Sequence, residues 1–491
     1  MSDAKSLAEL GLTARSGNAR ARVTAITLDS RAVRPGTLFA ALPGTRVHGA
    51  EFIDPALRMG ASAILTDRAG AALAAEALAR HPGAALVVAE DARSALAMAA
   101  ALFFGAQPEV MVAVTGTNGK TSVASFARQL WTQLGHAAIN VGTTGVEGAW
   151  ETPLAHTTPD AVTLQRLLAE AAAEGVTHAA MEASSHGLDQ RRLEGVRLAA
   201  AGFTNLSQDH LDYHPTMEAY FQAKAGLFHR LLPEDGIAVI NTDDPWGARL
   251  AQEVEQPVIR VGQGAECELR MLAQRFSTRG QDLRFSLKGQ AHQVHLPLVG
   301  GFQAANALVA LGLVLATGSE AGAAIAAMEQ LQGVRGRMQL AATRGNGAPV
   351  FVDYAHTPAA VETALRALRP HVMGRLIVVL GAGGDRDKTK RPLMGKAAVE
   401  NADVVFVTDD NPRSEVPATI RAEIMTSCPD ATEVGDRAEA ILRAVDALEP
   451  GDALLIAGKG HETGQTIAGV VYPFDDLEQA SVAVAALDGK L

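Results

Sequence analysis

The sequence VMVAVTGTNGKTS, residues 110–122, decides the fold of this chain. It joins an apolar run at 110–114 to a glycine-rich turn, after which a helical pattern continues to about residue 134. Strand, glycine-rich turn and helix are the context of a phosphate-binding loop, although Val114 stands where the GxxxxGK[ST] pattern has its first glycine. In such a loop, backbone N–H groups bind phosphate oxygens, Lys120 adds a positive charge, and the Thr121 hydroxyl can ligate Mg²⁺. The stretch predicts ATP or GTP binding.

Short apolar runs alternate with longer Ala- and Leu-rich stretches along the chain, which is typical of parallel sheets covered by helices. At about 150 residues per domain, 491 residues correspond to three domains. A helical stretch at 92–104 ends at Gly105, and VRGR at 334–337 breaks a second helical pattern. We therefore expect an α/β protein with a small N-terminal α/β domain (1–90), a central P-loop parallel-sheet ATPase domain (91–332, including helix 92–104) and a C-terminal Rossmann-like α/β domain (333–491).

The same patterns locate individual elements. We expect helices at 71–80 and 217–231, antiparallel edge strands between about 262 and 295, and parallel strands at 23–28, 63–66, 86–89, 110–114, 178–182, 199–203, 237–240, 350–353, 376–380, 404–408 and 453–457.

Charge and composition exclude several classes of protein. The 43 Lys and Arg against 54 Asp and Glu give a net charge of −11 without a polybasic block, so neither nucleic acid nor membrane insertion is expected. Cys267 and Cys428 are far apart and lie in no CxxC motif, which argues against a disulfide framework or structural zinc. The N-terminus lacks the apolar segment of a secretory signal, and the longest apolar runs are too short to span a bilayer. We expect a soluble, cytoplasmic protein.

Polar side chains follow the predicted strand at 178–182. Glu182 ends that strand at the sheet edge where α/β proteins hold ligands, so it is a natural second Mg²⁺ ligand. Ser185 and His186 suggest a hydrolase, but adjacent residues do not make a nucleophile and base, and no GxSxG motif is present. Residues 157–160, TTPD, are explained by helix capping, with Thr as N-cap and Pro at the first position.

The next polar segment, residues 205–214, leaves two interpretations open. It could be a zinc or iron cluster, or one or two of its residues could contact a nucleotide-bound metal while the rest cap loops. The residues concerned are Asp209, His210, Asp212 and His214.

Four strands of the last domain end in polar loops, at 353–358, 381–387, 409–413 and 458–462. Because the carboxyl ends of parallel strands share one sheet edge, these loops are expected to build one site. Arg386 and Arg413 suit a carboxylate, while Asp410 and Glu462 suit an ammonium group. The pattern favours an amino acid as ligand.

These motifs resemble the ATP-dependent Mur ligases of peptidoglycan synthesis over nearly the whole chain. TGTNGKT alone is shared with folylpolyglutamate synthetases, but LDSR, GGDRDK and DNPR point to the members that add 2,6-diaminopimelate. The motifs are LDSR (28–31), TGTNGKT (115–121), HTTPD (156–160), MEASSHGLDQRR (181–192), TNLSQDHLDYH (204–214), GRMQ (336–339), DYAHTP (353–358), GGDRDK (383–388), DNPR (410–413) and GKGHE (458–462).

The resemblance implies a ligase that uses ATP and Mg²⁺ to join meso-diaminopimelate to the D-glutamyl γ-carboxylate of UDP-N-acetylmuramoyl-L-alanyl-D-glutamate through an acyl phosphate. The three domains would bind the UDP-sugar peptide, ATP and the amino acid, in that order. Lys224, by spacing alone a surface lysine, would be the family's carbamylated lysine (N6-carboxylysine), which helps to hold a second Mg²⁺. Alternatives are the same ligation with L-lysine, folylpolyglutamate synthesis, and a non-catalytic ATP-binding regulator.

The resemblance also implies the site residues. The UDP-sugar peptide would contact Leu28, Ser30, Thr45, Arg46, Val47, Thr157, Thr158, Ser184, Gln190 and Arg192. ATP would contact Gly116, Thr117, Asn118, Gly119, Lys120, Thr121, Ser122, Asn306, Arg337 and Asp353. The metal would be held by Thr121, Glu182, His210 and Lys224, and diaminopimelate by Arg386, Asp410, Asn411, Pro412, Arg413, Gly458 and Glu462. The catalytic set would be Lys120, Glu182, His210, Lys224 and Arg337.

Overall fold

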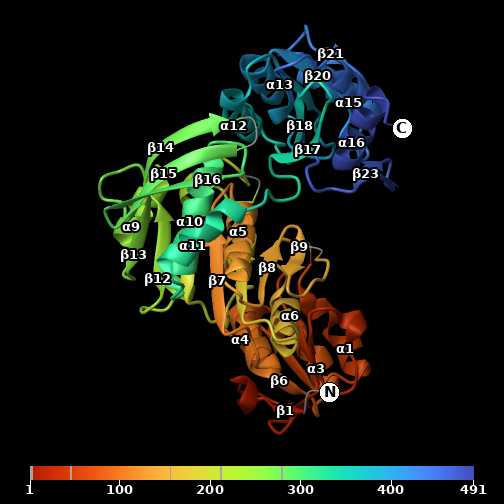
Figure 1. Cartoon of the computed structure of the whole chain (residues 1–491). Coiled ribbons are helices and arrows are strands. Elements are labelled where there is room, and N and C mark those ends of the chain that lie inside the picture. Colours follow the sequence, from red (N-terminus) through yellow and green to blue (C-terminus); the bar gives the residue numbers. More distant parts are fainter. Residues whose placement is uncertain (1–3, 45–46, 155, 211–212, 278–279, 491) are drawn as a thin grey trace.

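The computed structural model describes residues 4–44, 47–154, 156–210, 213–277 and 280–490. They form three α/β domains arranged in chain order, each with its own sheet (Figure 1). The central domain lies between the other two. No helix among the described residues is long and apolar enough to cross a membrane.

The N-terminal domain has a four-stranded parallel sheet in the order β3-β4-β5-β6. Its two faces carry separate apolar cores, one around Leu38 and Leu65 and the other around Phe39 and Ile64. Its strands are β3 (Ala25–Thr27), β4 (Thr37–Ala41), β5 (Ala63–Thr66) and β6 (Ala85–Val88), with an antiparallel pair β1 (Lys5–Ser6) and β2 (Arg22–Val23), helices α1 (Ile53–Arg58), α2 (Arg68–Leu73) and α3 (Ala75–Arg80), and 3-10 turns at Ala8–Leu10, Ser30–Ala32 and Gly49–Phe52.

Helix α4 (Ala92–Phe104) has the predicted bounds and ends at Gly105. We expected it to belong to the second domain, but its buried Leu96, Ala99 and Phe103 belong to the core of the N-terminal sheet. Its other side contacts α6 (Ala161–Ala173) of the central domain. The helix is therefore shared between the two domains, because both of its faces are apolar.

The central domain contains a ten-stranded sheet in the order β16-β15-β14-β13-β12-β11-β7-β10-β8-β9. The strands from β13 to β8 run parallel, and the expected antiparallel strands form one edge. The strands are β7 (Val110–Thr115), β8 (Ala138–Gly142), β9 (Gly145–Gly148), β10 (His178–Glu182), β11 (Ala200–Phe203), β12 (Ile237–Asn241), β13 (Val258–Gly262), β14 (Leu269–Ser277), β15 (Gly280–Leu287) and β16 (Gln290–Leu296).

Helices cover both faces of the parallel part of this sheet, because the strands there are mostly apolar and buried. The face with Phe126 and Leu308 is covered by α5 (Lys120–Gln133), α10 (Phe302–Ala316) and α11 (Ala321–Ala327), which a 3-10 turn follows (Met328–Gln330). The opposite face is covered by α6, α7 (Ser185–Asp189), α8 (Met217–Gly226), which continues as a π-helical turn (Leu227–Leu231), and α9 (Pro245–Glu253).

The C-terminal domain has six strands in the order β17-β18-β22-β19-β20-β21, all parallel except β17. The strands are β17 (Gln339–Thr343), β18 (Pro349–Asp353), β19 (Leu376–Leu380), β20 (Val404–Val407), β21 (Thr432–Glu433) and β22 (Ala453–Ala457). One face packs on α12 (Pro358–Leu368), α13 (Lys390–Asn401) and α14 (Pro417–Met425), and the other on α15 (Arg437–Asp446) and α16 (Asp476–Leu487).

Two smaller features lie beside the main sheet of this domain. A hairpin of β23 (Gly464–Ile467) and β24 (Val470–Pro473) follows the loop after β22. The 3-10 turn Arg369–His371 contacts the central domain, where the Gly300 N–H donates to His371 Nε2 at 3.1 Å. The second and third domains are therefore in direct contact beyond their linker.

Candidate active site

The phosphate loop connects β7 to α5, and β7 is flanked by β10 and β11 inside the sheet. Gly119 has φ +87°, and a Cβ there would lie 2.5 Å from Asn306 Oδ1 on α10. Only glycine fits this position, since both the backbone angle and the space exclude a side chain. Asn306, which the resemblance assigned to ATP together with the loop, thus lies directly beside it.

The loop after β11 holds the phosphate loop in place. The Thr117 N–H donates to the Asn205 carbonyl oxygen at 2.8 Å, and the Asn118 N–H donates to Asn205 Oδ1 at 3.0 Å. The Thr204 hydroxyl donates to the Asn118 carbonyl at 2.6 Å. Asn205, which sequence reasoning placed only in a polar segment, is therefore a support of the loop.

Two lysines converge on one backbone carbonyl of the loop. The ammonium groups of Lys120 and Lys224 donate to the Gly116 oxygen at 2.9 and 2.8 Å. Lys224 is 1% exposed and its Nζ lies 4.5 Å from the centre of the Tyr220 ring. By spacing alone it had looked like a surface lysine; the structure buries it.

Burial changes the protonation of both lysines. It lowers the pKa of the Lys224 amine well below its ordinary value, and the neighbouring charge of Lys120 lowers this pKa further. Burial also lowers the pKa of Lys120, although Glu182 and Asp209 oppose the shift. A Lys224 amine with a lowered pKa spends more time neutral, and only a neutral amine is a nucleophile.

Glu182 ends β10 beside the phosphate loop and is 1% exposed. Its two carboxylate oxygens accept hydrogen bonds from the Thr143 N–H at 2.7 Å and the Thr143 hydroxyl at 3.2 Å. Together with the Thr121 hydroxyl this gives oxygen donors of the kind that Mg²⁺ prefers. The chemistry of the side chains present therefore fits a magnesium ion.

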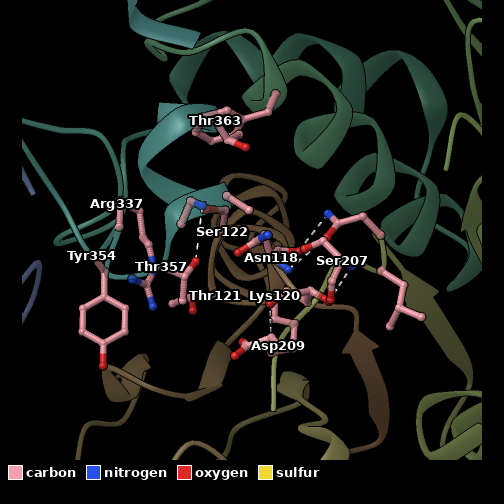
Figure 2. Close-up of a pocket in the computed structure, with 18 of the residues that line it drawn as sticks. Asn118, Lys120, Thr121, Ser122, Ser207, Asp209, Arg337, Tyr354, Thr357 and Thr363 are labelled. Carbon is pink, nitrogen blue, oxygen red and sulfur yellow. Dashed lines mark hydrogen bonds between the residues drawn. The ribbon is translucent and has the colours of Figure 1, made fainter. Parts of the chain in front are cut away.

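A cavity of about 540 Å³ lies between the central and C-terminal domains. Figure 2 shows Lys120 and Thr121 on one side of it and Arg337 and Tyr354 on the other. The Arg337 guanidinium stacks on the Tyr354 ring at 4.6 Å. The predicted ATP residues in its wall are Thr117, Asn118, Gly119, Lys120, Thr121, Ser122, Asn306, Arg337 and Asp353, together with Glu182, His210 and Lys224 from the predicted metal set.

Asp353 is the last residue of β18, and its Oδ2 accepts from the Met338 N–H at 2.7 Å. Burial raises the pKa of its carboxyl group, and Arg337 opposes the shift. The Asp353 carbonyl oxygen accepts from the Gly458 N–H at 3.1 Å. Asp353 therefore connects the wall of this cavity to the loop after β22.

The five residues predicted to contact the muramoyl peptide in the central domain are partly brought together. Arg192 Nη1 donates to the Thr158 carbonyl at 2.6 Å and its Nη2 donates to Gln190 Oε1 at 2.8 Å. The Thr158 hydroxyl is buried and accepts from the Ser184 N–H at 3.1 Å. Thr157 and Ser184 line the cavity of about 540 Å³. We expected a threonine to cap helix α6, and this was wrong: Asp160 is the N-cap, because its carboxylate accepts from two N–H groups of the first turn.

A second cavity, of about 480 Å³, adjoins the first. Thr143 and Thr157 line both cavities. Asn411, Arg413 and Glu462, three of the seven residues predicted to bind the amino acid, face these threonines across it. The junction of the two cavities is therefore where a group activated by the nucleotide could meet an amine.

The loops after β20 and β22 are joined by a network of side chains. Asn411 Nδ2 donates to Glu462 Oε2 at 2.8 Å, and Arg413 Nη1 donates to the Gly384 carbonyl at 2.7 Å. Lys459, which has no exposed side-chain surface, lies 3.5 Å from Asp410 Oδ1 and 3.4 Å from Glu462 Oε2. Lys459 was missed from the sequence because its position in GKGHE does not reveal that it is buried.

Four of the predicted residues stand apart from the second cavity. Arg386 is exposed and lines neither cavity, while Pro412, Asp410 and Gly458 lie behind the residues that do. They remain in the three loops that the carboxyl ends of β19, β20 and β22 bring to one edge.

The described residues of the predicted uridine set, Leu28, Ser30 and Val47, lie in the N-terminal domain and line neither cavity. Leu28 and Ser30 follow β3, and Val47 follows β4, so all three are at the carboxyl edge of that sheet. Leu28 is 38% and Val47 47% exposed, which leaves them accessible to a ligand. Thr45 and Arg46 lie outside the described residues.

The geometry does not support the two other interpretations of the polar segments, a serine hydrolase and a zinc or iron cluster. The buried Ser185 hydroxyl, in the cavity wall, has no hydrogen-bond partner among the described residues, so no base activates it. Within the described part of the chain, no three His, Cys, Asp or Glu side chains gather as a metal cluster would need, and Asp212 lies outside that part.

Sequence reasoning missed several cavity residues on the C-terminal side. Tyr354, His356 and Thr357 follow Asp353 in the DYAHTP motif, and Thr363 comes from α12. The motif itself was a signal for the first three, since it follows a strand that ends at the site, but nothing in the sequence marked Thr363.

Comparison with known proteins identifies relatives for every domain. Residues 22–104 match "Mur ligase family, catalytic domain", residues 114–314 match "Mur ligase middle domain", and residues 336–460 match "Mur ligase, glutamate ligase domain". The UDP-N-acetylmuramoyl-L-alanyl-D-glutamate–2,6-diaminopimelate ligase of Rhizobium meliloti is 51% identical, with 98% of each chain covered. That of Caulobacter vibrioides is 50% identical, with 95% of this chain and 96% of the relative covered.

Solved structures of Mur ligases resemble this chain in fold. A UDP-N-acetylmuramoyl-L-alanyl-D-glutamate–2,6-diaminopimelate ligase has 33% identity and a TM-score of 0.71, with 99% of each chain covered. A MurF ligase from Thermotoga maritima, solved in complex with ADP, has 19% identity and a TM-score of 0.62, with 95% of this chain and 98% of that chain covered, a likeness that shows the fold alone.

Proposed function

The chain belongs to the Mur ligase family, and on this basis we propose that it joins meso-2,6-diaminopimelate to UDP-N-acetylmuramoyl-L-alanyl-D-glutamate in an ATP-dependent step of peptidoglycan synthesis. The observation that carries the proposal is the pair of adjoining cavities. One is lined by a phosphate loop, and the other by Asn411, Arg413 and Glu462. An acid-activating site and an amine-holding site must meet in such a ligase.

The reaction begins with activation of the acid. A carboxylate is a poor acyl donor because its leaving group would be oxide, so the D-glutamyl γ-carboxylate attacks the γ-phosphorus of ATP and ADP leaves. Lys120 and Arg337, on opposite walls of the nucleotide cavity, spread the charge of the transferring phosphoryl group. Positioning supplies most of the rate, since no protein nucleophile is required.

The amine then attacks the acyl carbon, and phosphate leaves as the amide bond forms. Arg413 is suited to hold the distal carboxylate of diaminopimelate, and Glu462 its ammonium group. Enclosure between the two domains keeps water from the acyl phosphate. We propose that closure of the C-terminal domain about the linker near Gly336 completes this enclosure.

A magnesium ion would be held by Thr121, Glu182 and His210, and Lys224, as a carbamate, would help to hold a second one; the ions would neutralise phosphate charge. The structural support for the carbamate is the burial of Lys224 and its lowered pKa, because CO₂ adds to a neutral amine. The carbamate carries a negative charge, so it would also remove the repulsion between two neighbouring lysines.

The proposed division of labour follows the domains. Residues 1–90 would bind the UDP-sugar peptide, with Leu28, Ser30 and the segment 45–47 at the uridine. Residues 91–332 would bind ATP, and residues 333–491 the amino acid. We place the enzyme in the cytoplasm, because its two nucleotide substrates, ATP and a UDP-sugar, are made there.

A phosphate-release assay tests the function directly. The enzyme is given ATP, Mg²⁺ and UDP-N-acetylmuramoyl-L-alanyl-D-glutamate, with meso-diaminopimelate, L-lysine or no amino acid. Release with diaminopimelate alone is the expected result. Release with L-lysine would keep the mechanism and overturn the specificity, because Arg413 would then have no carboxylate to bind. No release with either amino acid would favour the non-catalytic regulator.

A further inference from the structure

A fully buried ion pair lies beneath the amino-acid loops of the C-terminal domain. Arg437, the first residue of α15, and Asp476, the first residue of α16, both have 0% exposed side chains. Arg437 Nε donates to Asp476 Oδ1 at 2.7 Å, and Arg437 Nη2 donates to Oδ2 at 2.6 Å. This two-point contact fixes the plane of the guanidinium.

The guanidinium also donates to two backbone carbonyls that belong to different loops. Arg437 Nη1 reaches the Asp409 oxygen at 3.3 Å, and Nη2 reaches the Ala457 oxygen at 3.0 Å. Asp409 directly precedes Asp410, and Ala457 directly precedes Gly458. One side chain therefore binds the two loops exactly where the predicted amino-acid residues begin.

The sheet itself does not join these loops. They follow β20 and β22, and the strand order β22-β19-β20 places β19 between them. β20 pairs with β19 and β21, and β22 pairs with β19 and β18, but the two strands do not pair with each other, so no ladder hydrogen bond joins the two loop starts directly. Arg437 joins the two loop starts directly, through its bonds to the Asp409 and Ala457 carbonyl oxygens.

We propose that Arg437 is a positioning residue for the amino-acid subsite, and that Asp476 holds its guanidinium in the orientation that sets the spacing of the two loops. The inference rests on the proposed function, since the spacing matters for catalysis only if the loops bind the incoming amino acid. Asn411 and Glu462, which lie on the two loops and bond to each other at 2.8 Å, are the side chains whose alignment depends on it.

Arginine is needed because its planar fork serves four acceptor atoms at once. A lysine at position 437 keeps a positive charge beside Asp476, so the buried carboxylate is not left alone. Its single ammonium group cannot reach Asp476 and both carbonyls in the same arrangement. Arg437→Lys therefore separates the stabilising role of the charge from the positioning role of the fork.

The opposite end of the same sheet offers a control arginine with similar partners and a more exposed side chain. Arg375 precedes β19, and its Nη2 donates to Asp452 Oδ2 at 2.7 Å and to the Ala447 carbonyl at 2.8 Å. It thus joins an acidic side chain and a backbone carbonyl at the amino ends of the strands, far from the loops of the site. Arg375→Lys should alter stability without altering amino-acid binding.

The test compares four proteins by phosphate release below their melting temperatures: the wild type, Arg437→Lys, the double variant Arg437→Met with Asp476→Leu, and Arg375→Lys. The double variant removes both charges, so it leaves no buried ion unpaired. We expect the KM for diaminopimelate to rise about tenfold or more in both Arg437 proteins. The KM for ATP should change less than about twofold, by the same positional argument. Arg375→Lys should keep the wild-type KM values.

The outcomes separate this inference from the proposed function. If either folded Arg437 protein keeps the wild-type KM for diaminopimelate, or if the KM for ATP rises equally, the positioning role is wrong while the function stands. If the KM for diaminopimelate rises as the melting temperature falls across all four proteins, including Arg375→Lys, then Arg437 only stabilises the fold. If the wild type itself shows no release that depends on diaminopimelate, the function fails and this inference fails with it.

Discussion

The two adjoining cavities are built by different means. The cavity proposed for the nucleotide depends on backbone groups of the phosphate loop and on Lys120 and the buried Lys224, which share the Gly116 carbonyl. The cavity proposed for the amino acid depends on side chains that bind one another across loops, such as Asn411 with Glu462. A backbone site is hard to alter without changing the fold, whereas a side-chain site can be altered one group at a time. Substitutions in the first should therefore lower the rate, and those in the second should change affinity and specificity.

The largest effect is expected from Lys120→Met. Lys120 is the cation of the phosphate loop, so its removal should lower kcat by about 10²- to 10³-fold, as for other groups that stabilise transition-state charge. Steady-state phosphate release measures this. Lys396→Met, which removes an exposed lysine of α13, is the control and should retain wild-type kcat. A Lys120→Met enzyme within tenfold of wild type would mean that the loop does not hold the reacting phosphates.

A somewhat smaller loss is expected from Lys224→Ala. If Lys224 carries a carbamate, the variant should lose about 100-fold in rate, the cost of misplacing a reacting group, and should be partly rescued by acetate. The rescue is measured as kcat against acetate concentration. Lys120→Met should show no such rescue, because a carboxylate does not replace its positive charge. Full activity of Lys224→Ala would end the carbamate assignment.

On the amino-acid side, Arg413→Ala should act on affinity. Loss of one charge-assisted hydrogen bond is expected to cost about 1.5–3 kcal/mol, which raises the KM for diaminopimelate by about 10- to 100-fold. The KM for ATP should stay near the wild-type value, as measured in the same assay with ATP varied. An unchanged KM for diaminopimelate would remove Arg413 from the subsite.

The smallest effect is a sensitivity to acid that the central and C-terminal domains share, through the buried His178 and the half-buried His461. Burial lowers the pKa of His178, in the central domain, and of His461, in the amino-acid loop, from 6.5 to about 4. Because the unfolded chain binds these protons first, stability should be complete above pH 6.5 and fall as the pH drops towards 4, by at most about 3 kcal/mol per group. Urea unfolding across this range measures the loss of stability.

His178→Leu should make stability depend less on pH while leaving the KM for diaminopimelate unchanged. An equally steep pH dependence in that variant would exclude His178 as its source.

Much of the fold could be predicted because the strands are short apolar runs between clear turn signals. The predicted bounds of β5, β10, β19 and β22 are those observed. The strand β4 (Thr37–Ala41) was missed, since its sequence TLFAA resembles the Ala-rich helices around it. The helix expected at 71–80 is two helices, α2 and α3, which meet at Ala74. Local sequence does not report such breaks when both sides have high helix propensity.

The candidate site could be predicted only as far as its motifs reach. Motifs name residues in turns and at the ends of strands and helices, so Lys120, Glu182 and Arg337 were found, and the structure places all three around one cavity. They do not reveal burial, which is why Lys459 and the pair Arg437–Asp476 were not singled out. They do not reveal backbone strain either. Positive φ angles occur in or beside predicted site residues at Arg191, His210, Met338, Asp385 and Arg413, a conformation that costs energy and that only the surrounding fold can impose.

The nucleotide cavity has walls from two domains that have separate apolar cores. A ligand that binds both walls therefore ties together two units that could otherwise melt one after the other. In a calorimeter, the empty protein should absorb heat in more than one step, and saturating nucleotide should merge the steps of the central and C-terminal domains while leaving that of the N-terminal domain in place. ATP would then act on this chain as a source of folding cooperativity as well as a substrate.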